Sequence, residues 1–189
     1  MNEFSIVCRL LGSLFQRDPS DPILSPIITL ISEGKLSSLW PLEQDELFNS
    51  LKNSVKDLAP VTADYQSLFG SEMPAVSIYA HDYSDIKEAN IRQFLVARGM
   101  PVTENATDSF GALLLAASWL EDNSAEDEVL AQTQLFDEYL LPWTGAFLGK
   151  VEAHATSGFY RTLAVITRGA LSALHEELLD DNADDTEVE

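Results

Sequence analysis

The sequence contains a single cysteine, Cys8, among its 189 residues. One cysteine excludes an internal disulfide and a thiolate metal cluster. Hydrophobic residues recur at helical spacing from Phe4 to Phe15, and Cys8 lies on their face. Because free cysteines are among the most buried side chains, we expect Cys8 to be an unreactive part of the core.

Sequence motifs of enzymes and metal sites are also missing. The chain has neither of the glycine-rich phosphate-binding patterns, GxxxxGK(S/T) and GxGxxG, nor the GxSxG pattern of serine hydrolases. Its three histidines, His81, His154 and His175, are far apart and show no HExxH-type spacing. We therefore expect no catalytic residue, no cofactor and no metal ion, and we assign the histidines to surface or capping positions.

Basic residues are scarce. The 11 lysines and arginines stand against 31 aspartates and glutamates, which gives a net charge of -20 at pH 7. Nucleic acids and anionic membrane surfaces are bound through clusters of Lys and Arg, so neither is expected as a partner. A negative surface favours the encounter with a cationic partner. The alternative is that the acidity serves only solubility.

Long hydrophobic runs are lacking as well. No tract of 18 apolar residues occurs, so we expect no membrane insertion. The N-terminal segment MNEFSIVCRLLGSLF is apolar but lacks the basic start and the cleavage site of a signal peptide, and it predicts a first core helix. Together these features predict a cytoplasmic protein.

Helical hydrophobic periodicity is what the chain has in abundance. The sequence is 46% hydrophobic, and its spacing predicts an all-α fold, a single-domain helical bundle of about eight to ten helices with long loops over residues 1–179. Gly34 and Pro60 are each expected to end a helix. Ser124 and Asp127 have the spacing of a capping box that opens another.

The last ten residues, 180–189, read DDNADDTEVE and contain no base. Runs of like charge are usually disordered, so we expect a disordered acidic tail. One interpretation is a solvated tail without a role. The other is a tail that attracts a cationic ligand or competes for it.

The segment FGALLLAASWL, residues 110–120, is strongly apolar. It is too short to span a bilayer core of roughly 30 Å, and it therefore predicts a buried helix. Thr107 or Asp108 is expected to cap the start of this helix.

Two stretches without helical period, residues 70–84 and 99–109, flank the predicted helix that carries Arg92. Long ordered loops in compact domains are often functional. Aromatic and apolar residues surround the first loop, and Glu104 and Asp108 place carboxylates on the second. An apolar groove rimmed by carboxylates suits a peptide with arginines beside hydrophobic residues, because Arg forms bidentate bonds to carboxylates. The alternative is that the aromatic side chains only complete the core under the loops.

Five short motifs follow one another along the chain: YQSLF (65–69), IRQF (91–94), DSFGALLL (108–115), LPW (141–143) and FYR (159–161). Their order and spacing resemble the TorD/DmsD/NarJ family of cytoplasmic chaperones, with the DmsD branch as the nearest match. The resemblance implies an all-helical chaperone that is not an enzyme. It further implies binding to the twin-arginine leader and the apo form of a molybdoenzyme catalytic subunit, such as a dimethyl sulfoxide reductase, which is held back from export until cofactor insertion.

The resemblance and the loop composition together nominate leader-binding residues. From the family motifs these are Tyr65, Leu68, Phe69, Pro74, Arg92, Gly99, Asp108 and Ser109, and the composition of the loops adds Tyr79 and Glu104. Ser109 stands where the family has His, and Ala75 where its loop has Trp, and both departures bear on which client is bound. The alternative function is a general acidic helical adaptor that binds a basic protein without leader specificity. Hinges such as Pro142 would permit a homodimer by segment exchange.

Overall fold

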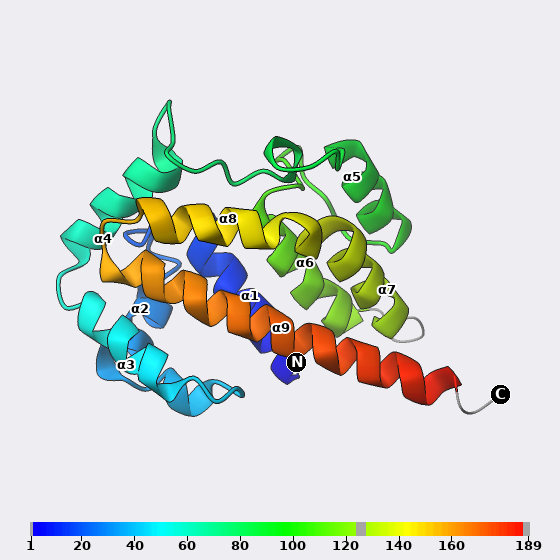
Figure 1. Ribbon diagram of the computed structural model, residues 1–189, viewed down its shortest axis with the longest axis horizontal. Helices are drawn as coiled ribbons and strands as arrows, with labels where there is room; N and C mark the ends of the chain where they lie inside the picture. Colours follow the sequence, from blue (N-terminus) through cyan, green and yellow to red (C-terminus); the bar gives the residue numbers. More distant parts are fainter. Residues whose placement is uncertain (1, 124–127, 187–189) are drawn as a thin grey trace.

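Helices dominate the computed structural model, which describes residues 2–123 and 128–186 (Figure 1). The α-helices are α1 (Glu3–Gln16), α2 (Ser25–Glu33), α3 (Asp45–Ser54), α4 (Leu58–Tyr65), α5 (Glu88–Ala97), α6 (Phe110–Asn123), α7 (Glu128–Gln134), α8 (Leu141–His154) and α9 (Gly158–Thr186). Between them lie π-helical turns at Gln66–Gly70 and Leu135–Leu140 and 3₁₀ turns at Ser37–Leu39 and Ala80–Asp82. Within the described residues the β pairing is limited to one isolated bridge, and the predicted all-α class is confirmed.

Helix α1 packs against α6 inside the bundle and lies behind α9 in Figure 1. Cys8 on α1 is fully buried, as expected, and its burial raises the pKa of the thiol. The two helices approach closely at a pair of glycines. A Cβ on Gly111 would lie 2.8 Å from the carbonyl oxygen of Gly12, and a Cβ on Gly12 would lie 3.0 Å from that of Gly111. This crossing therefore needs glycine on both helices, and it sets the end of α1 beside the start of α6.

Helix α9 crosses the front of the bundle and packs against α3 and α8 (Figure 1). Its start is fixed by Asp64, a buried carboxylate on α4. Asp64 accepts hydrogen bonds of 2.5–3.0 Å from the backbone N–H and the hydroxyl of both Thr156 and Ser157, the two residues before α9. The buried charge is thereby satisfied, and the entry to the longest helix is tied to α4.

The observed helix ends agree only in part with those predicted from the sequence. Gly34 ends α2 in the left-handed conformation, as expected. The prediction for Pro60 is wrong, since the preceding helix α3 ends at Ser54 and Pro60 lies in the first turn of α4. A first-turn residue has no acceptor for its N–H within the helix, so proline is tolerated there. The predicted capping box of Ser124 and Asp127 lies outside the described residues.

The C-terminal helix extends further than the sequence indicates. The boundary of the folded chain is expected at residue 179, but α9 continues to Thr186. Its apolar side is buried as far as Leu178. Each further residue adds one backbone hydrogen bond to a helix already formed, which lets residues 180–186 continue it despite their charge.

Candidate functional site

The two loops that the sequence singles out are joined to each other. Ala80 donates its backbone N–H to the carbonyl of Asp108 at 3.0 Å, and Phe110 donates to the carbonyl of Ile78 at 2.8 Å. These bonds form the isolated bridge between Tyr79 and Ser109. Residues 78–80 thus lie against residues 108–110, and of the predicted site residues on the two loops this junction brings together Tyr79, Asp108 and Ser109.

Asp108 is buried at this junction and pairs with a histidine. Its side chain is 1% exposed, and its Oδ2 lies 2.5 Å from Nδ1 of His81, whose own side chain is 54% exposed. The second carboxylate oxygen, Oδ1, accepts no hydrogen bond from any residue that the structure describes. The His81 ring stacks on Tyr79, with centroids 5.5 Å apart and planes at 16°.

The hydrogen bond to Asp108 raises the pKa of His81, burial opposes it, and the charges of Asp108 and Asp82 raise the pKa further. His81 is at the surface, as expected, but its ring also contacts the buried carboxylate of Asp108. Periodicity and motif spacing give no signal for this contact, since it joins residues 27 positions apart.

Ser109 connects the junction to the end of α1. Its hydroxyl donates to Oε1 of Gln16 at 3.0 Å and accepts the backbone N–H of Ala112 at 3.3 Å. Ser109 is therefore the N-cap of α6, and the prediction of Thr107 or Asp108 in that role is wrong. The carbonyl of Gln16 also accepts the Tyr65 hydroxyl at 3.4 Å. Gln16 links both halves of the predicted site, and nothing in the sequence distinguishes it from other polar residues at a helix end.

Arg92 faces the second loop from α5. Its guanidinium pairs with Glu88 one turn earlier and donates to the carbonyls of Thr103 at 2.7 Å and Asn105 at 2.9 Å. Glu88 also accepts the backbone N–H and the hydroxyl of Thr107, at 3.3 and 2.8 Å. The bonds from Arg92 and Thr107 lower the pKa of the Glu88 carboxyl. Arg92 thus holds the loop in place, and the four-residue spacing to Glu88 is the sequence signal for this pair.

Gly99 begins the same loop, and Glu104 is exposed near its middle. Gly99 has a φ of 79°. Its N–H donates to the carbonyl of Val96 at 2.9 Å, and the N–H of Met100 donates to the carbonyl of Leu95 at 3.1 Å. This left-handed residue terminates α5 and turns the chain back over the bundle. The left-handed backbone explains why glycine stands at this position, and a contact of Gly99 with the leader stays a prediction.

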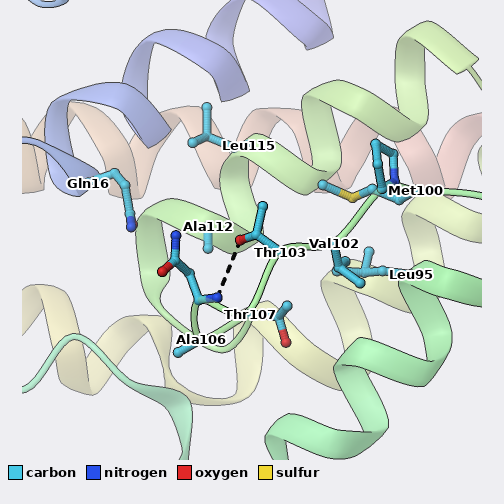
Figure 2. Close-up of a pocket in the computed structure, with 11 residues that line it drawn as sticks. Gln16, Leu95, Met100, Val102, Thr103, Ala106, Thr107, Ala112 and Leu115 are labelled. Carbon is cyan, nitrogen blue, oxygen red and sulfur yellow. Dashed lines mark hydrogen bonds between the residues drawn. The ribbon is translucent and has the colours of Figure 1, made fainter.

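A cavity of about 240 Å³ lies under this loop. Figure 2 places Leu95, Met100 and Val102 on one side of it and Gln16, Ala112 and Leu115 on the other. We call it the loop pocket, and its lining is completed by Pro101, Thr103, Asn105, Ala106 and Thr107. It is smaller than the roughly 300–1,000 Å³ of pockets for drug-sized ligands, and so it is matched to one or two apolar side chains. Asp108 directly follows Thr107, the last residue of this loop that lines the pocket.

The predicted residues of the YQSLF motif lie mostly inward. Leu68 is fully buried, and Phe69 packs edge-on against Phe15 and Tyr160 with ring centroids 6.4 and 5.7 Å away. Tyr65 is half-buried and contacts Phe69. For Leu68 and Phe69 the interpretation as core residues under the loops accounts for the contacts. Pro74 is exposed on the first loop, whose next two residues, Ala75 and Val76, donate their backbone N–H groups to the carbonyls of Ser67 and Leu68.

The described residues contain no cluster of three or more His, Cys, Asp or Glu side chains able to hold a metal ion. None of the helices that the structure describes is both long enough and apolar enough to cross a membrane. What the site offers is an apolar pocket, a covered carboxylate and a loop held by polar clamps. These are elements of a binding site.

A family model described as "Nitrate reductase delta subunit" matches residues 35–149 of the chain. The chain belongs to this family. It is 56% identical over 183 residues to the chaperone protein YcdY of Escherichia coli (strain K12), with 96% of this chain and 99% of that protein covered. It is 24% identical over 201 residues to the Tat proofreading chaperone DmsD of Salmonella typhi, with 94% and 92% covered.

Membership of the nitrate reductase delta subunit family confirms the TorD/DmsD/NarJ resemblance. Its members are maturation chaperones for redox enzymes, and the protein is accordingly not an enzyme. The expected position nearest DmsD is not supported, since the identity to YcdY is more than twice the identity to DmsD.

Proposed function

We propose that the protein is a cytoplasmic maturation chaperone that binds the twin-arginine leader and the apo form of a molybdoenzyme catalytic subunit. It would hold this client back from export until the cofactor is inserted. Family membership and the similarity to a Tat proofreading chaperone support the proposal. The observation that carries it is the buried carboxylate of Asp108, which directly follows Thr107 in the wall of the apolar loop pocket.

The chemistry of such a leader matches the two parts of this site. A guanidinium donates two parallel hydrogen bonds to a carboxylate, and the bond is stronger away from water. Apolar side chains next to the arginines would enter the loop pocket, whose walls are largely aliphatic. The net charge of -20 would speed the approach of a cationic segment and make the association sensitive to salt.

Isothermal titration calorimetry with the leader peptide of a molybdoenzyme from the same organism tests the proposal. Two control peptides are needed, one with both arginines replaced by lysine and one with the same residues in scrambled order. The chaperone proposal expects binding that weakens with salt and is lost in both controls. Equal binding of all three peptides would favour a general acidic adaptor for basic segments. Absence of leader binding at low salt would reject the proposal.

A further inference from the structure

The contact between His81 and Asp108 leaves the buried carboxylate half-satisfied. Oδ2 has the His81 ring nitrogen at 2.5 Å, while Oδ1 is buried and accepts no hydrogen bond within residues 2–123 and 128–186. A buried acceptor without a partner destabilises the state in which it occurs. The free protein therefore holds a carboxylate that a better donor could satisfy more completely.

His81 is also a largely exposed side chain in direct contact with this buried carboxylate. The Asp108 side chain is 1% exposed and the His81 side chain 54% exposed. The imidazole is held at the surface by its contact with Asp108 and by stacking on Tyr79, at 5.5 Å. An imidazole offers one N–H to a carboxylate, whereas a guanidinium offers two in the spacing of the two oxygens.

We propose that His81 is a displaceable placeholder, which occupies Asp108 in the free protein and is exchanged for an arginine side chain of the client. The inference rests on the proposed function, because it specifies how the same site receives its cationic ligand. In the bound state both oxygens of Asp108 accept from the guanidinium, and the His81 ring moves away from the carboxylate. The loop pocket, whose lining includes Thr107, receives an apolar side chain near that arginine.

This exchange couples binding of the client to the protonation state of His81. The charged groups that face His81 are Asp108 and Asp82, with His81 Nε2 3.8 Å from Asp82 Oδ1, and the ring of Tyr79 stacks on it. Asp108 holds the pKa of His81 above its ordinary value in the free protein. Loss of that contact, and the arrival of a cation, lower this pKa in the complex. Binding therefore releases a proton, and affinity falls as the pH drops through the pKa of the free protein.

Titrations of an acetylated, histidine-free leader peptide between about pH 8 and about pH 6 test the placeholder, since this window spans the usual titration of histidine. The informative variant is His81→Gln, which keeps a neutral donor of similar length but cannot titrate. The matched control is His175→Gln, because His175 pairs with Asp137 at 2.8 Å and stacks on Phe136, remote in sequence from both loops.

Wild type and His175→Gln are expected to lose affinity as the pH falls, by up to about tenfold per pH unit, which is the limit for one linked proton. His81→Gln is expected to bind with nearly constant affinity. The same pH dependence in His81→Gln as in wild type would overturn the proposal that His81 is displaced from Asp108. So would loss of binding by His81→Gln at every pH, which would make His81 a direct ligand of the peptide.

A second probe separates this inference from the proposed function. N-acetyl-arginine amide, with N-acetyl-lysine amide as its control, is added to protein labelled at histidine nitrogens, and the ring signals are assigned with the two variants. A shift of the His81 signals by the arginine compound alone supports the placeholder, even if the leader peptide does not bind. Unchanged His81 signals with both compounds would overturn it, even if the leader peptide binds elsewhere.

Discussion

Glu88 and Arg92 lie one turn apart on α5 and together hold the loop of residues 99–109 over the pocket. Glu88 accepts two bonds from Thr107, and Arg92 donates to the carbonyls of Thr103 and Asn105. Their side chains are 31% and 33% exposed. The clamp is local to the loop, so its loss is expected to loosen the site more than the bundle.

Arg92→Ala is predicted to destabilise the protein by about 1–2 kcal/mol, through the loss of hydrogen bonds to two loop carbonyls. Hydrogen exchange should accelerate at the amides of residues 103–107 and little elsewhere. The control is Arg168→Ala, which removes the more exposed ion pair with Glu152 and should cost about 0–1 kcal/mol. Unchanged exchange in the loop of Arg92→Ala would mean that the clamp does not order it.

Gly111→Ala tests the crossing of α1 and α6. The added Cβ would lie 2.8 Å from the carbonyl oxygen of Gly12, which belongs to rigid helix backbone. We expect a loss of about 1–3 kcal/mol in the free energy of unfolding, measured by denaturant titration. Gly145→Ala in α8 is the control, because its Cβ would meet nothing within 4 Å. At Gly145 the better helix propensity of alanine should stabilise the protein by about 0.5–1 kcal/mol. Equal effects of the two variants would contradict the close approach of α1 and α6.

Glu128 on α7 lies among the carboxylates of Glu121, Asp122 and Asp181. Burial, followed by the hydrogen bond and the charge of Glu121, raises the pKa of Glu128 to about 7. Between the unfolded value of about 4.3 and this value, the folded chain holds a proton that the unfolded chain has lost. Stability from this site is therefore present at low pH and decreases as the pH rises through about 7.

Glu128→Gln should accordingly be more stable than wild type at about pH 8 and equally stable at about pH 4, because the amide stays neutral throughout. Thermal unfolding over this pH range measures the difference. Glu46→Gln on the exposed side of α3 controls for the removal of one negative charge. A constant difference between Glu128→Gln and wild type at all pH values would argue against a raised pKa.

The helices were largely predictable because their signals are local. Gly34 ends α2 through its own left-handed backbone, and the stripe that contains Cys8 is repeated within one helix. Pro60 misled because proline is compatible with the first turn of a helix as well as with its end. The end of α9 could not be read from charge alone, since a helix anchored by buried residues propagates beyond them.

The site was less predictable because its contacts join distant segments. The composition of the loops drew attention to residues 70–84 and 99–109, and the ten nominated residues remain predictions as leader contacts. The Arg92 guanidinium donates hydrogen bonds to two carbonyls of the second loop, and the Leu68 side chain is buried in the core. The roles of His81 and Gln16 depend on the bridge between the loops, which no periodic pattern encodes.

Asp108 is proposed to receive an arginine of the client, and the isosteric variant Asp108→Asn removes the charge of this carboxylate while keeping its shape. Leader-peptide titrations of wild type and Asp108→Asn should be run at low and high salt, with thermal unfolding to verify that the variant is folded. We expect Asp108→Asn to bind the leader peptide at least about tenfold more weakly, since a hydrogen bond to a charged group is worth about 1.5–3 kcal/mol. Its affinity should also depend less on salt. Equal affinity and equal salt dependence of the two proteins would contradict it.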